Sequence, residues 1–142
     1  MYNTRIRAGC VIIQNNAILL VEFHDESGLH YNLPAGGVND YEEIKSAAKR
    51  EVKEETSIDV EVGELAFTYE FLDTVNKKHS LGLFFDCKVT GGTASLPTNP
   101  DPNQTGVKWI SIDELDSIVL YPNIKKEIRE FAEHKVTIPL LK

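Results

Sequence analysis

The sequence predicts an α/β fold in which two main helices cover a β-sheet. Segments rich in β-branched and aromatic residues outnumber the two long segments that have a helical pattern. The chain has 142 residues, of which 42% are hydrophobic and 26% charged, as in an ordinary globular domain. No repeat, low-complexity tract or linker divides it. We therefore expect residues 1–142 to form a single domain.

The N-terminal part is expected to form a β-hairpin. Two β-rich runs occupy residues 10–13 and 17–23. Between them stand Gln14, Asn15 and Asn16, and asparagine tolerates the left-handed backbone of a tight turn. The two runs should therefore pair as neighbouring antiparallel strands.

The next part of the chain predicts a loop followed by a helix. Residues 31–37 contain a proline and paired glycines, which favour a loop over a strand or a helix. Residues 41–56 contain no Gly or Pro and consist mainly of strong helix formers. Asp40 is the expected N-cap, and Glu42 and Glu43 would lie in the first turn.

The remainder predicts further strands and a second helix. The strands are expected at residues 60–70, 80–89 and 107–110. Ser111 would start a short helical turn. Pro122 suits the first turn of a C-terminal helix whose apolar stripe contains Ile124, Ile128 and Phe131. The tail, residues 136–142, either adds an edge strand or covers a neighbouring subunit, so a homodimer is one of two alternatives.

Composition narrows the classes of partner and compartment. The chain has 22 Asp and Glu against 15 Lys and Arg, a net charge of -7 that repels nucleic acid. An anionic small molecule remains compatible, because a metal ion or a few cationic side chains reverse the local field. The apolar runs are too short to span a membrane, and residues 1–5 lack the apolar region of a secretory signal. Cys10 and Cys87 lie in apolar segments and are expected to be buried thiols. We expect a cytoplasmic protein with neither a membrane nor a nucleic-acid partner.

The predicted helix places three glutamates close to its inward face. On a helical wheel of about 100° per residue, Ile44 marks the centre of an apolar inward stripe. Glu51 and Glu55 fall within about 20° of Ile44, whereas Glu54 lies about 80° away. The lysines of the segment occupy the opposite side.

A solvated face of mixed Glu and Lys is the alternative interpretation of this run, since charge-rich helices usually face water. Three like charges turned partly toward a core repel one another and lose hydration, so they require a compensating cation. Oxygen-only ligands favour Mg²⁺, with Mn²⁺ as a substitute, over zinc. The wheel therefore indicates a magnesium site at Glu51, Glu54 and Glu55.

The same segment resembles the Nudix box, the pattern G-x5-E-x7-R-E-U-x-E-E-x-G-U in which U is an aliphatic residue. The match runs from Gly36 to Ile58 and departs from the pattern only where Ser57 replaces the last glycine. Its other fixed positions are Glu42, Arg50, Glu51, Val52, Glu54 and Glu55. So many fixed positions are more specific than a short glycine pattern.

The resemblance implies a Nudix-type α/β/α sandwich with a mixed β-sheet, and a hydrolase that cleaves a phosphoanhydride bond in a nucleoside diphosphate linked to another moiety. By position, Glu51, Glu54 and Glu55 would bind the divalent cation, with the carbonyl of Ala35 as a backbone ligand. Either Glu51 or Glu54 would accept the proton of the attacking water. Arg50 would complete the catalytic set by orienting these carboxylates through charge-assisted hydrogen bonds.

Other positions of the pattern carry narrower expectations. Glu42 would hold the loop and the helix start through Arg50 or a backbone amide. Ser57 stands where glycine accommodates a positive φ, so we expect an altered helix end. Many relatives use a further acidic residue from a later loop, and here Asp101 and Gln104 are the two candidates.

The substrate is expected to be a small nucleotide. Tyr31 is a candidate for stacking on a base, or alternatively an aromatic residue of the core. Arg5 and Arg7 share one face of the first strand and are candidates for binding phosphate. ADP-ribose or another nucleotide sugar is the expected substrate. The alternatives are a nucleoside triphosphate pyrophosphohydrolase and a catalytically silent Nudix-like ligand-binding domain, although the complete set of carboxylates argues against the latter.

Overall fold

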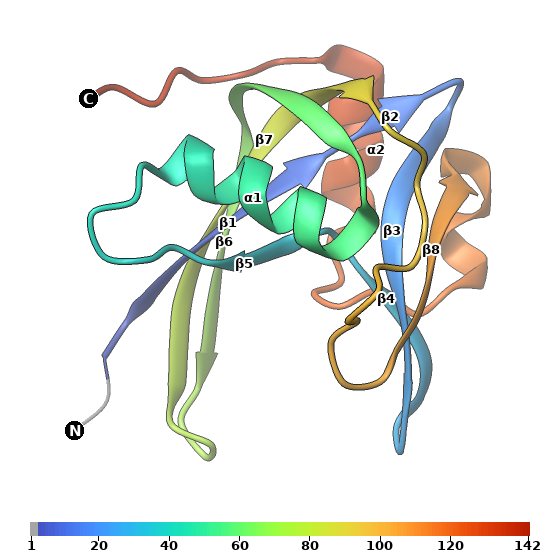
Figure 1. Cartoon of the computed structure of the whole chain (residues 1–142), viewed down its shortest axis with the longest axis horizontal. Coiled ribbons are helices and arrows are strands. Elements are labelled where there is room, and N and C mark those ends of the chain that lie inside the picture. The colour runs from blue at the N-terminus through green and yellow to red at the C-terminus, as the bar shows by residue number, and fades with distance from the viewer. Residues whose placement is uncertain (1–2) are drawn as a thin grey trace.

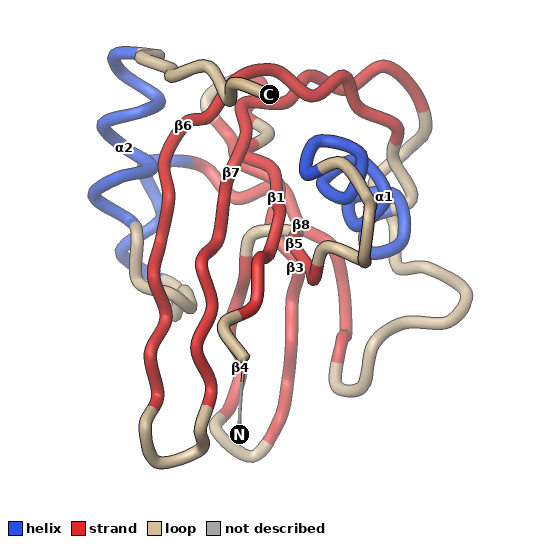
Figure 2. Tube along the Cα trace, turned by 90° about the vertical axis from the view of Figure 1, so that its left-hand side faces the viewer, coloured by secondary structure: helices blue, strands red, loops and turns tan. Residues whose placement is uncertain are grey.

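The computed structural model describes residues 3–142 (Figure 1). Met1 and Tyr2 lie outside the described residues. They belong to residues 1–5, the segment that lacks the apolar region of a secretory signal. Two four-stranded sheets pack together, and the helices α1 and α2 lie on opposite sides of the first sheet (Figure 2). The predicted α/β class, with a mixed sheet and two main helices, is confirmed.

The first sheet is mixed, because one of its inner pairs is parallel. Its strand order is β5 (Ala35–Gly37), β1 (Arg5–Val11), β7 (Lys78–Gly91) and β6 (Asp59–Asp73). β1 runs parallel to β7, whereas β5 pairs with β1 and β6 with β7 in antiparallel fashion. The strands β6 and β7 include the segments predicted at residues 60–70 and 80–89 and extend beyond them at both ends.

The second sheet contains the N-terminal hairpin, but in a shorter form than predicted. β2 (Ile13–Gln14) pairs with β3 (Ala17–Asp25), and Asn15 and Asn16 take positive φ values of 51° and 59°. Residues 10–11 belong instead to β1 in the first sheet, because the chain crosses from one sheet to the other at Ile12. The predicted hairpin is therefore present, but of residues 10–13 only Ile13 belongs to its first strand. β4 (Gly28–Asn32) and β8 (Gln104–Ser111) lie on either side of β3.

Residues 31–37 do not form the predicted loop. The first two end β4, and the last three form β5, in which Ala35 and Gly37 pair with Gly9 and Arg7 of β1. The glycines here allow close approach and do not make a turn. A Cβ atom on Gly36 would lie 2.1 Å from the Cδ atom of Glu51. A strand without side chains at these positions therefore lets the helix rest against its edge.

Helix α1 (Ile44–Thr56) begins three residues later than predicted, and Asp40 is not its N-cap. The residue at the N-cap position is Glu43, which makes no capping hydrogen bond. Tyr41 has a φ of 61°, outside the helical region. The Oε1 atom of Glu42 accepts a hydrogen bond from the Asn39 amide at 3.1 Å, so this carboxylate holds a turn before the helix.

The C-terminal end of α1 has the altered cap expected from the sequence. Ser57 takes the left-handed conformation, with a φ of 68°, that the family pattern assigns to glycine. Its backbone amide donates to the Lys53 carbonyl at 3.0 Å, and its hydroxyl donates to the Ser95 carbonyl at 3.2 Å. A second contact thus supports a conformation that is unfavourable for a residue with a side chain.

The C-terminal elements follow the prediction with one shift. The turn after Ser111 is a 3₁₀-helix, η1 (Ile112–Ser117), and the Ser111 hydroxyl accepts the Asp113 amide. The last helix is α2 (Lys125–His134), so Pro122 precedes the helix instead of lying in its first turn. The tail forms an antiparallel bridge to β6 through Ile138 and Leu65, whose amides and carbonyls make two hydrogen bonds of 2.9 Å. The homodimer stays a prediction.

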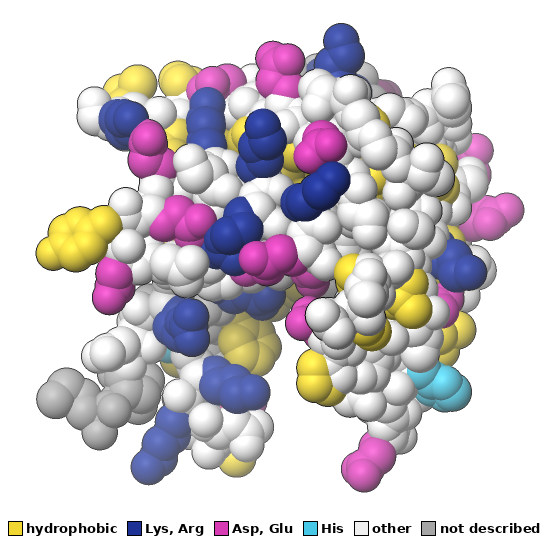
Figure 3. Space-filling model, viewed as in Figure 1, with side chains coloured by type: hydrophobic (Ala, Val, Ile, Leu, Met, Phe, Trp, Pro, Cys, Tyr) yellow, Lys and Arg dark blue, Asp and Glu magenta, His cyan; other side chains and the backbone are white. Residues whose placement is uncertain are grey.

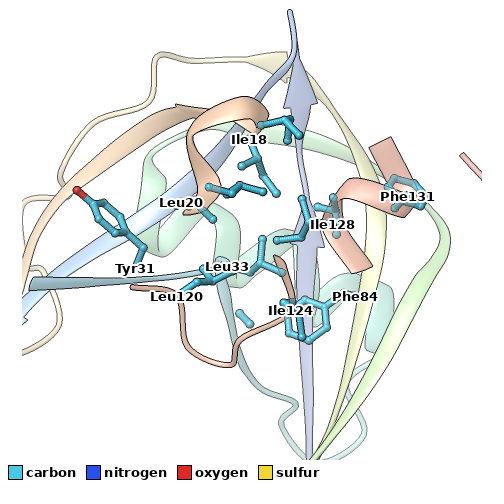
Figure 4. Packing of buried hydrophobic residues seen from close by; sticks show 13 residues of the cluster. Ile18, Leu20, Tyr31, Leu33, Phe84, Leu120, Ile124, Ile128 and Phe131 are labelled. Carbon is cyan, nitrogen blue, oxygen red and sulfur yellow. The ribbon is translucent and has the colours of Figure 1, made fainter. Parts of the chain in front are cut away.

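The core is divided by the first sheet into two apolar clusters. One lies under α1 and includes both cysteines, which are buried as predicted. The other lies between the sheets and α2, where Ile124, Ile128 and Phe131 are buried as predicted (Figure 4). None of the helices within residues 3–142 combines the length and apolar character that a membrane span requires.

Replacing Gly9 by alanine should destabilise the fold. The new Cβ atom would lie 2.6 Å from both the Pro34 carbonyl oxygen and the Ala35 Cβ atom, where β1 meets β5. We expect the free energy of unfolding, measured by urea denaturation, to fall by about 1–3 kcal/mol. Gly91→Ala is the control, since its Cβ atom would meet nothing closer than 3.6 Å. Equal losses in both variants would contradict this account of the β1–β5 contact.

Candidate active site

The three glutamates of α1 differ in exposure in the order that the helical wheel predicts. Glu55 is the most buried, with 8% of its surface exposed. The side chain of Glu51 is 15% exposed and that of Glu54 is 57% exposed. The helix therefore carries a gradient from a desolvated carboxylate to a solvated one, which a solvated Glu/Lys face would not produce.

Glu55 is held at the start of β5. Its Oε1 atom accepts a hydrogen bond from the Ala35 amide at 2.9 Å. Burial and the nearby charge of Glu51 raise the pKa of Glu55 from 4.5 to about 8, although the Ala35 amide and Arg7 act in the opposite direction. In the metal-free protein at neutral pH, this carboxyl group is therefore largely protonated.

Glu51 lies against the backbone of β5, in the space left by the missing side chain of Gly36. Burial raises the pKa of Glu51, and its hydrogen bond with Arg50 lowers it in part. The charges of Glu54 and Asp101 also raise it. Two neighbouring carboxyl groups, Glu51 and Glu55, are thus both disfavoured in their charged forms.

Arg50 ties the loop before α1 to the carboxylates on it. Its Nε and Nη2 atoms donate to the two carboxylate oxygens of Glu42 at 2.8 and 2.9 Å. Its Nη1 atom donates to Glu51 at 2.8 Å and to Glu54 at 3.3 Å. Its Nη2 atom also donates to the Gly37 carbonyl at 3.0 Å. Both partners expected for Glu42, Arg50 and a backbone amide, are present, and hydrogen bonding to Arg50 lowers the pKa of Glu42 to about 2.

Asp101 faces the glutamates across a cavity of about 450 Å³, which Glu51, Glu54 and Glu55 also line. Gln104, the other candidate from this loop, is buried and turned toward the backbone. Its Nε2 atom donates to the Glu55 carbonyl at 2.9 Å, and its Oε1 atom accepts the Asp101 amide at 3.3 Å. Gln104 therefore fixes the loop, and Asp101 reaches the cavity.

The carboxyl groups of these residues suit a hard divalent cation. Their side chains do not, however, converge on one point. Within residues 3–142, no group of three or more His, Cys, Asp or Glu side chains converges to hold a metal ion as it stands. Arg50 accounts for this in part, because it draws Glu51 and Glu54 toward its own Nη1 atom. The cavity nevertheless has four carboxyl groups in its lining, beside one lysine, and two of the four are poorly solvated. A cation would relieve their repulsion.

The predicted backbone ligand Ala35 stands between this cavity and Arg7. Its carbonyl accepts a hydrogen bond from the Arg7 Nη2 atom at 3.3 Å, while its amide donates to Glu55. Arg7 and Arg5 both lie on the exposed part of β1. The structure thus brings Arg7, but not Arg5, into hydrogen-bonding contact with the residue that holds Glu55.

Tyr31 lies in the core, with its hydroxyl at the surface. Its ring belongs to the cluster between the sheets, and Figure 4 shows the hydroxyl pointing away from that cluster. The hydroxyl donates to the Glu22 carboxylate at 2.9 Å. These contacts are those of an aromatic residue of the core, the alternative to base stacking that the sequence left open for Tyr31.

Asn32, the neighbour of Tyr31, lines a cleft that sequence reasoning missed. Its Oδ1 atom is buried and has no hydrogen-bond partner within the described residues. The cleft, which we call the aromatic cleft, measures about 390 Å³, and four of its ten lining residues are aromatic. A buried amide oxygen without a partner is energetically costly. The lining residues are Arg7, Asn32, Tyr69, Phe71, Ser80, Gly82, Phe84, Tyr121, Pro122 and Asn123.

Comparison with known proteins gives consistent matches. The family described as NUDIX domain matches residues 3–134. A putative 8-oxo-dGTP diphosphatase of Bacillus subtilis is 32% identical over 122 residues, covering 85% of this chain and 74% of the relative. An RNA pyrophosphohydrolase of Bartonella clarridgeiae is 30% identical over 121 residues, or 70% of each chain.

Solved structures share the fold over nearly the whole chain. A NUDIX hydrolase from Nitrosomonas europaea has a TM-score of 0.84 at 25% identity and covers 99% of this chain and 97% of its own. An ADP-ribose pyrophosphatase from Streptococcus suis has a TM-score of 0.69 at 23% identity, with coverages of 96% and 98%. At 23% identity, the likeness to the Streptococcus suis protein concerns the fold alone.

Glu55→Gln should stabilise the metal-free protein above pH 8. The pKa of Glu55 in the folded protein, about 8, lies above its ordinary value of 4.5, so the folded state favours the protonated form. The stability that this proton provides is complete below pH 4.5 and is lost as the pH rises through 8. Glutamine removes the buried charge and can still accept the Ala35 amide. The gain, measured as the shift in thermal midpoint in EDTA, should therefore shrink as the pH falls.

Glu54→Gln is the matched control, because the side chain of Glu54 is largely exposed. It should give no comparable gain above pH 8. A gain of equal size in both variants, or one that grows at low pH, would contradict a desolvated Glu55.

Proposed function

Because the chain belongs to the Nudix family and is a Nudix-type hydrolase, we propose that it hydrolyses a phosphoanhydride bond in a nucleoside diphosphate linked to another moiety. Nudix hydrolases generally use divalent metals, and for this chain we propose Mg²⁺, with Mn²⁺ as a substitute. The proposed substrate is ADP-ribose or another nucleotide sugar.

The observation that carries the proposal is the poorly solvated pair Glu51 and Glu55 at a cavity that Glu54 and Asp101 also line. Four carboxyl groups around one cavity repel one another and favour a cation. Arg50 supplies positive charge beside Glu51, and Arg7 supplies it near Glu55. A structural role alone would not require the costly burial of Glu55.

Glu51, Glu54 and Glu55 are the side chains that would hold the cation, with the Ala35 carbonyl as a backbone ligand and Asp101 as a further donor. The bound ion would neutralise phosphate oxygens and acidify a water molecule. Arg50 is a positioning residue, since its hydrogen bonds set the directions of the Glu51 and Glu54 carboxylates. The base that accepts the proton of the attacking water is Glu51 or Glu54, the two carboxylates that share the Arg50 Nη1 atom.

The aromatic cleft is the proposed site for the base of the nucleotide. Tyr69, Phe71 and Tyr121 offer rings for stacking on a base, and Asn32 lines the same cleft. Arg7 stands between this cleft and Ala35, where it would contact the diphosphate. A nucleotide in this cleft would thus reach the carboxylates across β5.

A nucleoside triphosphate pyrophosphohydrolase is the second candidate. Its support is the match to a relative named as a putative 8-oxo-dGTP diphosphatase. Family membership and the complete set of box carboxylates speak against a catalytically silent binding domain. We also propose a cytoplasmic location, with which the two free cysteines agree.

A substrate panel tests the proposal. ADP-ribose, nucleotide sugars and nucleoside triphosphates are incubated with and without Mg²⁺, and the products are identified. AMP and a sugar phosphate support the first candidate, whereas a nucleoside monophosphate and pyrophosphate support the second. Hydrolysis that does not depend on a divalent cation would overturn the metal role, and no hydrolysis of any member would overturn both candidates.

Glu54→Gln should reduce Mg²⁺-dependent turnover by roughly 10²-fold or more, because it removes a proposed metal ligand and base. The fold should persist, since this side chain is mostly exposed. Glu61→Gln, on the exposed side of β6, is the control and should leave turnover unchanged. Initial rates and far-UV circular dichroism measure the two effects. Undiminished activity of Glu54→Gln would exclude Glu54 from the site.

A further inference from the structure

A second pocket, which we call the basic pocket, lies beside the aromatic cleft at the open end of the first sheet. It measures about 510 Å³ and shares Arg7, Phe71 and Ser80 with that cleft. Figure 3 shows Lys and Arg side chains gathered below α1, on the part of the surface formed by β1 and the β6–β7 hairpin. The lining residues are Asn3, Arg5, Arg7, Gly37, Phe71, Asp73, Lys77, Lys78, His79 and Ser80.

The charge of this pocket is opposite to that of the whole chain, which is -7. Four cationic side chains line it: Arg5, Arg7, Lys77 and Lys78. Within residues 3–142, no carboxylate oxygen lies within 4.0 Å of a charged nitrogen of any of the four. Asp73 is the one acidic side chain in the lining.

One carboxylate offsets these four cations only in part, and the charge of Asp73 acts on Lys78. The Asp73 carboxylate accepts the amides of Val75 and Asn76 and the Asn76 side chain, so it is occupied in closing the hairpin turn. His79 contacts Glu70 at 2.8 Å and Thr4 at 3.0 Å. Like charges gathered without partners disfavour folding and favour the binding of an anion.

The basic pocket is joined to the active site through β5. A Cβ atom on Gly37 would lie 2.5 Å from the Arg5 Nη2 atom, so glycine at this position lets Arg5 approach the strand. The carbonyl of the same glycine accepts the hydrogen bond from Arg50, which holds Glu51 and Glu54. Gly37 therefore has the basic pocket on one side and the carboxylate network on the other.

From this arrangement we propose that the basic pocket binds a phosphate group of the substrate that is not part of the cleaved anhydride. The inference rests on the proposed function, because it places this phosphate relative to a nucleotide cleaved at the carboxylates. Arg5 offers a planar guanidinium group for phosphate oxygens, and Lys77 and Lys78 add charge from the hairpin. Arg7, at the boundary with the aromatic cleft, stays with the diphosphate. Only substrates that carry a phosphate besides the cleaved diphosphate would use this pocket, whereas ADP-ribose would leave it free.

Two sources provide this chemistry: the terminal phosphate of a longer polyphosphate chain, and a phosphodiester group of an oligonucleotide. Comparing KM for a nucleoside triphosphate, a short 5′-triphosphorylated oligonucleotide and ADP-ribose separates them. The Lys77→Gln/Lys78→Gln variant should raise KM more for the phosphate-rich substrate that uses the pocket than for ADP-ribose. Equal KM changes for all three would overturn the inference.

Binding of inorganic tripolyphosphate in EDTA tests the pocket without hydrolysis. Without a divalent cation the carboxylate cavity repels this probe, so calorimetric titration reports the basic pocket. In the Lys77→Gln/Lys78→Gln variant we expect the Kd to rise roughly tenfold and the salt dependence to weaken. The control, Lys88→Gln/Lys126→Gln, removes the same charge from two lysines outside the pocket and should leave the Kd nearly unchanged.

Equal weakening in both double variants, or none in either, would overturn the inference. The result is independent of the proposed function, because an inactive protein would still bind tripolyphosphate here. Loss of hydrolysis with all substrates would instead count against the carboxylate site and leave the binding result as it stands.

Discussion

Arg50 is the side chain on which the arrangement of the site depends. It connects Glu42 before the helix, Glu51 and Glu54 on the helix, and the carbonyl of Gly37 in β5. Because a guanidinium group directs its donors in one plane, these contacts fix the loop and the carboxylates relative to each other. The same contacts turn two carboxylates toward Arg50. Ion binding would therefore redistribute hydrogen bonds that already exist.

The short strand β5 separates the two halves of the proposed substrate site. On one side Glu51 rests against Gly36, and Glu55 accepts the amide of Ala35. On the other side Arg7 reaches the Ala35 carbonyl, and the aromatic cleft and the basic pocket begin there. Side chains at the two glycines would push these halves apart. A strand with almost no side chains lets the proposed catalytic groups and the proposed substrate-binding groups lie close to its two sides.

Periodicity made the inward position of Glu51 and Glu55 predictable, because residues on one face of a helix recur at fixed spacing. The start of α1 was not predictable in this way, since Glu42 is engaged by Arg50 from eight residues away and Tyr41 breaks the helix. Long-range pairing likewise gave β5 a strand conformation that its local composition disfavours. No motif or periodicity in the sequence singles out Asn32. That its Oδ1 atom is buried without a hydrogen-bond partner among the described residues depends on how distant strands pack.

We propose that the desolvated carboxyl groups at this cavity bind a divalent cation. Calorimetric titration of the metal-free protein with Mg²⁺ near pH 7, in buffers of different ionisation enthalpy, tests it most directly. Since the pKa of Glu55 is about 8, binding should release close to one proton, and the observed heat should vary with the buffer. Binding without proton release, or no binding at millimolar Mg²⁺, would contradict the claim.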